Sequence, residues 1–325
     1  MALAKNGRPG EGGPFRGLAP AGMLGLLMSL TMAGCSLAQR GDLIALADGR
    51  HMHLVCAGHG APAVIFESGF GATAAAWDKV TPTLAKQTRV CAYDRAGYGT
   101  SDPGPLPRDG AAIAKDLDDT LRAARISGPF VMVGHSAGGL YVRLFADRRP
   151  KDVVGMVLVD PSVDHQDRQL SMFGPRAADL SGIRQRVEHC LEVARGWAQE
   201  DKEGPTSRCR DRGKILPAAA WETQLSELDT LWRATSDEVT AGRASYGDLP
   251  LIVLTAGRLY EGVSEPLKDA LSARWRAVHR DVANRSSRGQ ELLVDSPHLI
   301  MVLHPEAVIQ AVDEVLQQIK PNAKP

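Results

Sequence analysis

The chain has 325 residues, and its 38 lysines and arginines are balanced by 38 aspartates and glutamates. Hydrophobic residues make up 44% and charged residues 23%, which excludes a collagen-like or highly charged disordered chain. A formal net charge of zero shows none of the basic excess that indicates nucleic-acid binding, and the length allows one large α/β domain or two smaller ones.

The first 38 residues are typical of an export signal. Lys5, Arg8 and Arg16 precede an apolar segment at 22–33. A membrane span needs about 20 apolar residues, so this segment is too short to cross a membrane. Its length suits the hydrophobic region of a signal peptide. Residues 32–35, Met-Ala-Gly-Cys, are similar to a bacterial lipobox, in which Cys35 would be lipidated and become the N-terminus.

An alternative is simple cleavage after Ala38, because residues 36–38 also fit the small-x-small rule of signal peptidase. Both readings predict an exported protein of the bacterial cell envelope. It would be lipid-anchored in the first case, and periplasmic or secreted in the second. The only membrane contact we expect is this lipid anchor.

Cysteine usage also favours export. Besides Cys35 the chain has four cysteines, Cys56, Cys91, Cys190 and Cys209. An even number in an exported chain suggests disulfide bonds. The alternative is that all four are ordinary buried thiols.

Apolar segments of strand length alternate with helical patterns. A hairpin turn, Asp48-Gly49, joins segments 43–46 and 51–56. Further strands are expected at 63–67, 89–93, 130–133, 155–159, 251–254 and 291–294. Apolar residues four apart predict helices around 113–121 and 308–319. Apolar strands separated by helices indicate an α/β fold with a mainly parallel sheet covered on both faces.

The strand pattern stops between Asp164 and Gly247. Trp221, Leu225, Leu228 and Trp232 would share one helical face there, which predicts an inserted helical cap. The expected organisation is a signal segment at 1–38, a core at 39–161 and 248–325, and a cap at 162–247.

Residues 134–138, Gly-His-Ser-Ala-Gly, carry the clearest chemical signal. They follow the strand at 130–133 and precede a helix that begins near Leu140. A G-x-S-x-G turn between a strand and a helix needs small neighbours and lifts the serine above the sheet edge. The helix N-terminus beneath it favours developing negative charge.

With this turn at Ser136, the chain resembles the α/β-hydrolase family. The resemblance rests on three further segments, 68–71, 93–101 and 295–298. It implies an eight-stranded, mostly parallel sheet, a cap after the sixth strand, and a catalytic triad in the order serine, acid, histidine. Ser68 is a departure, because many relatives have histidine there.

Within this resemblance Ser136 would be the nucleophile. His298 would be its base, since it stands in a loop between the last strand and the last helix. Two acids are possible: Asp160 after the sixth strand, or Glu261 after the seventh.

The family arrangement also implies an oxyanion hole made of the backbone N–H groups of Phe70 and Ala137. Its strand order places the second and fourth strands side by side, which would pair Cys56 with Cys91 within bridging range. Cys190 and Cys209 would then form a second disulfide, within the cap.

We therefore expect a serine hydrolase that cleaves an ester through an acyl-enzyme. The alternatives are a peptidase or amidase of the prolyl-aminopeptidase kind, and a non-catalytic binding module on the same fold. The partner would be a small-molecule ester or amide. No cofactor motif and no metal-ligand spacing occurs, so none is expected. Serine rather than aspartate at position 136 argues against dehalogenase or epoxide hydrolase chemistry.

Overall fold

The computed structural model describes residues 41–174, 179–201, 209–211, 214–260 and 263–319. The signal segment with Cys35 and the alternative acid Glu261 lie outside the described residues. Within this part of the chain, no helix combines the length and apolar character that a membrane crossing requires.

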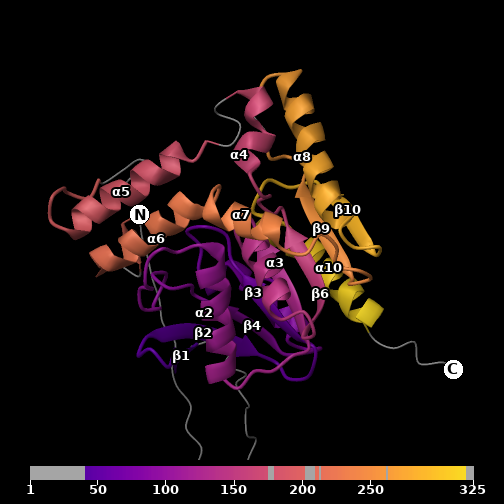
Figure 1. Ribbon diagram of the computed structural model, residues 1–325, viewed down its shortest axis with the longest axis horizontal. Coiled ribbons are helices and arrows are strands. Elements are labelled where there is room, and N and C mark those ends of the chain that lie inside the picture. The colour runs from indigo at the N-terminus through magenta and orange to yellow at the C-terminus, as the bar shows by residue number, and fades with distance from the viewer. Residues whose placement is uncertain (1–40, 175–178, 202–208, 212–213, 261–262, 320–325) are drawn as a thin grey trace, which may run out of the picture. The chain divides into compact units, whose positions relative to one another are not determined.

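A single eight-stranded sheet forms the centre of the fold, in the order β1-β2-β4-β3-β5-β6-β9-β10 (Figure 1). The strands are β1 Asp42–Ala45, β2 His51–Ala57, β3 Ala63–Glu67, β4 Val90–Tyr93, β5 Phe130–His135, β6 Val153–Val159, β9 Leu251–Ala256 and β10 Gly289–Val294. β2 runs antiparallel to both of its neighbours, and all other pairs are parallel. The predicted fold class is confirmed.

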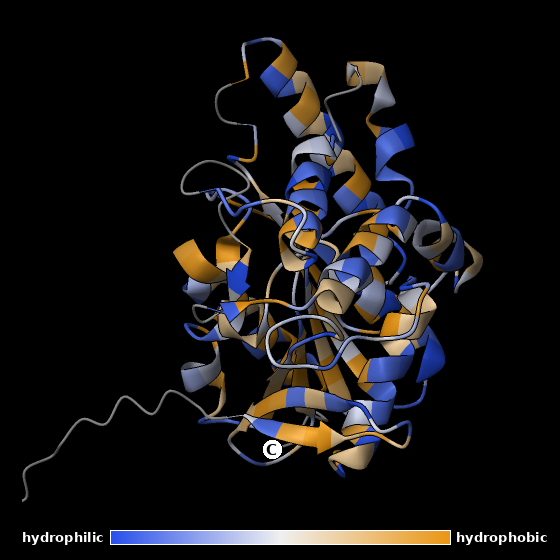
Figure 2. Ribbon diagram, turned by 90° about the vertical axis from the view of Figure 1, so that its left-hand side faces the viewer, coloured by the Kyte–Doolittle hydropathy of each residue, from blue (hydrophilic) through white to orange (hydrophobic). Residues whose placement is uncertain are grey.

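Helices cover both faces of the sheet, which is why its central strands are apolar on both sides. One face packs against α2 (Gly110–Ala123), α3 (Gly138–Arg148) and α8 (Leu267–Ala283). The other packs against α1 (Thr81–Leu84), α9 (Ile300–Leu303), α10 (Pro305–Ile319) and the short 3₁₀ helix η1 (Ala74–Trp77). In Figure 2 the helices carry alternating bands of hydrophilic and hydrophobic residues, as expected for helices that bury one face.

The predicted cap follows β6. It contains α4 (Gln166–Gln169), η2 (Ser171–Phe173), α5 (Ser181–Ala194), α6 (Ala218–Thr230) and α7 (Ala234–Ala241). A two-stranded ribbon of β7 (Arg210–Asp211) and β8 (Lys214–Ile215) also belongs to it. The helix predicted from the tryptophan and leucine spacing is α6, but it ends at Thr230, so Trp232 lies in the turn that follows.

Two disulfides link the chain. Cys56 and Cys91 stand directly opposite each other on the antiparallel pair β2–β4, with Cα atoms 4.2 Å apart. This separation is just below the usual range of about 4.4–6.8 Å, as facing residues of antiparallel strands allow. Cys190 of α5 is bonded to Cys209 just before β7, with a Cα separation of 5.0 Å.

Candidate active site

A sharp turn between β5 and α3 presents Ser136 at the sheet edge. Ser136 has φ +52°, in the left-handed region that non-glycine residues rarely adopt. A Cβ at Gly134 would lie 2.5 Å from the carbonyl oxygen of Gly138, and one at Gly138 would lie 2.4 Å from that of Glu67. Both glycines are therefore required by close packing. The Ser136 side chain is half-buried, and its hydroxyl bonds to no other described residue.

Asp160 and His298 meet beside this turn although 138 positions separate them. Asp160 directly follows β6 and is fully buried, whereas His298 stands in the loop after β10 with 37% of its side chain exposed. Nδ1 of His298 donates to Oδ2 of Asp160 at 2.5 Å. This hydrogen bond fixes the proton of a neutral imidazole on Nδ1 and leaves Nε2 as the basic nitrogen.

The Asp160 carboxylate is held on its other oxygen too. Oδ1 accepts hydrogen bonds from Nε1 of Trp275 at 2.8 Å and from the backbone N–H of Ala256 at 3.0 Å. Burial raises the pKa of the Asp160 carboxyl, but His298, His279 and the backbone N–H of Ala256 together outweigh burial and lower the pKa below its ordinary value. The carboxylate is thus ionised at neutral pH. Trp275, on α8, therefore helps to hold the Asp160 carboxylate, a role that the sequence did not indicate.

A second histidine, His135, supports the loop that carries His298. His135, the residue before Ser136, is buried, and its Nε2 donates to the backbone carbonyl of His298 at 3.1 Å. The two imidazole rings lie 4.6 Å apart. Burial lowers the pKa of His135 to about 3, so this ring is neutral and does not compete with His298 for a proton at neutral pH.

The loop of residues 68–71 runs against the same turn. A Cβ at Gly69 would lie 2.8 Å from Nδ1 of His135 and 3.0 Å from Cβ of Ser136, so only glycine permits this approach. The backbone N–H groups of Phe70 and Ala137 have no acceptor among the described residues. Two donors of this kind next to a serine hydroxyl suit an external oxygen atom.

Ser68, where the sequence departs from the pattern of the resemblance, anchors the 68–71 loop by its own hydrogen bonds. Its hydroxyl donates to the carbonyl oxygen of Thr73 at 2.9 Å and accepts a hydrogen bond from Nε1 of Trp77 at 3.0 Å. These two hydrogen bonds hold the 68–71 loop in place without a histidine at position 68.

Arg95 is a second residue that supports the site and that the sequence did not indicate. Its buried guanidinium donates to the carbonyl oxygens of Ser68 and Gly69 at 2.6 and 2.9 Å. It also pairs with Glu67 of β3 at 2.7 Å and Glu227 of the cap helix α6 at 3.0 Å. Arg95 lies in the 93–101 segment that carried the resemblance, but its partner Glu227 is 132 positions away, and no local pattern indicates that pairing.

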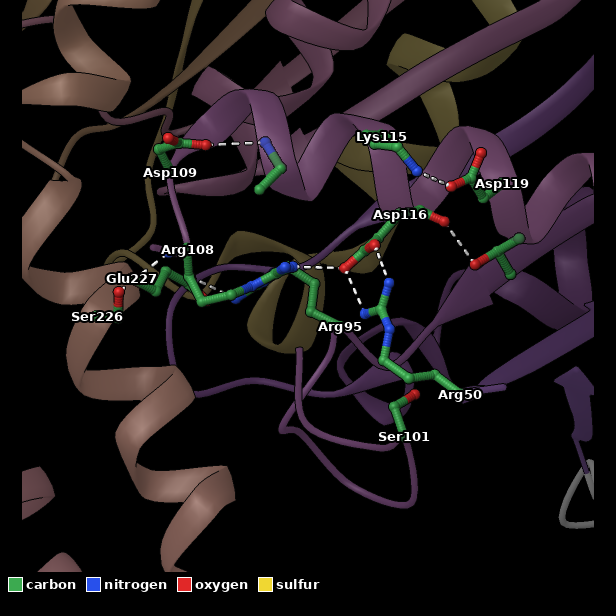
Figure 3. Close-up of polar contacts among 12 residues, drawn as sticks. Arg50, Arg95, Ser101, Arg108, Asp109, Lys115, Asp116, Asp119, Ser226 and Glu227 are labelled. Atoms are coloured by element: carbon green, nitrogen blue, oxygen red, sulfur yellow. Dashed lines mark hydrogen bonds and ion pairs between the residues drawn. The ribbon is translucent and has the colours of Figure 1, made fainter. Parts of the chain in front are cut away.

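A second buried arginine lies nearby without touching the 68–71 loop. Arg108 is as buried as Arg95, at 2% exposure each, and donates to Asp116 at 2.6 Å. Arg50 donates two hydrogen bonds, of 3.0 and 2.6 Å, to the same carboxylate. Figure 3 shows Arg50 and Arg108 converging on Asp116.

Comparison with known proteins bears on the fold that carries this site. A family model described as the alpha/beta hydrolase fold matches residues 62–187, which include the 68–71 loop, Ser136 and Asp160. The solved structure of a thermophilic esterase from Thermogutta terrifontis is 19% identical, with a TM-score of 0.58, and the match covers 86% of this chain and 99% of that one. The chain has the α/β-hydrolase fold.

Two curated relatives show how far the likeness extends along this hydrolase-fold chain. A Gibberella zeae protein described as an AB hydrolase superfamily protein is 23% identical over 286 residues, 80% of this chain and 87% of that protein. Protein YqjL of Bacillus subtilis is 32% identical over 100 residues, 31% of this chain and 40% of that protein. The second match thus spans less than half of the Bacillus protein.

Proposed function

We propose that the chain is a serine hydrolase that cleaves an ester through an acyl-enzyme, with Ser136 as nucleophile, His298 as base and Asp160 as the triad acid. The observation that carries the proposal is the hydrogen bond between His298 and the buried Asp160, formed beside a serine in a strand-to-helix turn. A serine hydroxyl is too weak a nucleophile at neutral pH unless a base takes its proton as it attacks.

In the first half of the reaction, Oγ of Ser136 attacks the ester carbonyl carbon while Nε2 of His298 takes the hydroxyl proton. Asp160 stabilises the resulting imidazolium through Nδ1. The negative oxygen of the tetrahedral intermediate accepts hydrogen bonds from the N–H groups of Phe70 and Ala137. The carbon–oxygen bond to the alcohol then breaks, and His298 gives its proton to the departing oxygen.

In the second half, water replaces the alcohol. His298 takes a proton from the water as its oxygen attacks the acyl carbon, and the bond to Oγ of Ser136 breaks. The proton returns from His298 to Oγ, which releases the carboxylic acid and restores the free serine.

Labelling with a fluorophosphonate probe tests whether the chain is an enzyme of this kind. We expect covalent modification at Ser136, located by peptide mapping, because the probe reacts only with an activated serine. A panel of p-nitrophenyl esters and aminoacyl amides then separates the esterase from the alternative peptidase or amidase. Absence of labelling would remove both enzyme functions and leave the binding module.

Export to the cell envelope, with or without a lipid on Cys35, also belongs to the proposal. The two disulfides support it, because such bonds persist mainly in oxidising compartments. They favour a location outside the reducing cytosol and do not distinguish a lipid anchor from simple cleavage.

A prediction for Arg95 follows from its bond to Gly69. The carbonyl of Gly69 and the N–H of Phe70 belong to one peptide group, and in a trans peptide these two bonds point in opposite directions. Arg95 therefore fixes the direction of the Phe70 N–H. We expect Arg95→Lys to lower kcat by about 10- to 100-fold with little change in KM, since loss of an oxyanion donor outright costs about 10²–10³. Lysine cannot reproduce the paired donors of arginine.

Arg108→Lys is the matched control, because Arg108 is equally buried and ion-paired but does not contact the 68–71 loop. Both variants should lose thermal stability, and only Arg95→Lys should lose kcat. Equal losses of kcat in the two variants would show that Arg95 acts on stability alone.

A further inference from the structure

A cavity of about 230 Å³ opens between the 68–71 loop and the cap. Its lining comes from the loop, the segment after β4 and the cap: Gly71, Thr73, Tyr98, Gly99, Arg186, Arg210, Leu216, Trp221 and Gln224. Two of these residues are arginines and none carries a carboxylate. The cap side is built on α5 and α6, which lie side by side in Figure 1 and share a buried cluster. The lining of the cavity thus includes positively charged side chains and no negatively charged one.

Arg186, on α5, is the cation available to a ligand. Its side chain is half-buried, and Nη2 lies 3.4 Å from the position that a Cβ would take at Gly71. It forms no ion pair with any acid in the described part of the chain. Arg210 differs, because Glu200 holds its Nε at 2.5 Å. The charge of Arg186 is thus left without a counter-charge beside the loop.

The cavity lies within reach of the nucleophile. The 68–71 loop touches the elbow at Gly69, whose Cβ would lie 3.0 Å from Cβ of Ser136. Two residues span at most about 7 Å of chain, so Gly71 and the cavity edge lie within about 12 Å of Ser136. A substrate with a chain of several carbon atoms can cover that distance.

We propose that this cavity binds a carboxylate carried by the ester substrate, with Arg186 as the binding residue. The inference rests on the proposed ester hydrolysis and adds the substrate class: an ester that bears a second, free acid group. The planar guanidinium matches a carboxylate with two parallel hydrogen bonds. Tyr98, Leu216 and Trp221 supply apolar walls for the carbon chain, as is usual where a few polar groups orient a ligand. The carboxylate is bound and undergoes no reaction.

The test compares kcat/KM for anionic esters and for neutral esters of equal length. One series places the carboxylate on the acyl side, as monomethyl esters of the dicarboxylic acids from succinate to suberate, against methyl esters of monocarboxylic acids. The other places it on the alcohol side, as butanoate esters of ω-hydroxy acids against butanoate esters of simple alcohols. We expect a preference for the anionic member in one series, at the chain length that reaches Arg186.

Arg186→Gln should then lower kcat/KM for the preferred anionic ester by about 10- to 100-fold and leave its neutral partner unchanged, because a charge-assisted hydrogen bond is lost. Arg184→Gln is the matched control. Arg184 stands two positions earlier on α5 and carries the same charge, but it pairs with Glu188 and Asp229 and does not line the cavity. It should not change the preference, which excludes a general effect of net charge.

Calorimetry on the Ser136→Ala protein gives the same comparison without turnover. The anionic ester preferred in the kinetic series should bind more tightly than its neutral partner of equal length (on the acyl side, for example, monomethyl adipate against methyl hexanoate), and Arg186→Gln should remove the difference. No preference for the anionic ester in either series, or equal effects of the two arginine variants, would overturn this proposal while ester hydrolysis stands. A protein that binds the anionic ester through Arg186 but hydrolyses no ester would overturn the proposed function instead.

Discussion

Replacing either Ser136 or His298 by alanine should abolish ester hydrolysis while the fold is retained. Members of a catalytic triad act as a unit, so the loss of either one costs about 10⁶-fold in kcat. Ser136 stands at a sheet edge and makes no side-chain hydrogen bond to a described residue, so its removal leaves no broken contact. The measurements are hydrolysis of the best ester, fluorophosphonate labelling, and thermal unfolding followed by circular dichroism.

His298→Ala has a further consequence, because it removes one of the three donors that surround the buried Asp160 carboxylate. We therefore expect a lower unfolding temperature for this variant and not for Ser136→Ala. His304→Ala is the matched control: His304 is 36% exposed against 37% for His298, and it also pairs with a carboxylate, that of Glu306. It should keep near-normal activity. Near-normal rates for His298→Ala would show that another group is the base.

Replacing Asp160 by asparagine should lower kcat by up to about 10⁴, and the structure shows why. The N–H groups of Trp275 and Ala256 both point at Oδ1, so the asparagine carbonyl oxygen is held there by two donors. Its NH₂ group must then face Nδ1 of His298. An N–H at this position forces Nδ1 to act as an acceptor and moves the imidazole proton to Nε2. A ring protonated on Nε2 cannot take the proton of Ser136.

The rival substitution is Glu261→Gln, which should leave kcat nearly unchanged if Asp160 is the acid. Both substitutions preserve the size of the side chain and remove its charge, so the comparison isolates the role of the carboxylate. Loss of kcat in Glu261→Gln, with a near-normal kcat in Asp160→Asn, would show that the triad acid lies in the loop after β9. Equal, mild losses in both would mean that neither carboxylate orients His298.

Local patterns in the sequence determined much of the fold. The apolar runs at 63–67, 130–133 and 251–254 lie in β3, β5 and β9, because a strand buried on both faces is apolar along most of its length. The turn at Ser136 was also readable, since both glycines and the adjoining strand and helix are contiguous in the chain. The end of α6 was less so: apolar spacing continued to Trp232, but the helix ends at Thr230.

Which distant residues meet depends on packing in three dimensions, which the sequence patterns do not report. Asp160 contacts His298 and Trp275, so two loops and the helix α8 meet where the sheet order brings the ends of β6 and β10 to one edge. The sequence alone left Asp160 and Glu261 open, because each follows a strand whose end lies at that edge. The pairing of Arg95 with Glu227 depends on how the cap seats on the core. Periodicity reports which face of a segment is buried, whereas the partner of a buried charge is set by packing between segments far apart in the chain.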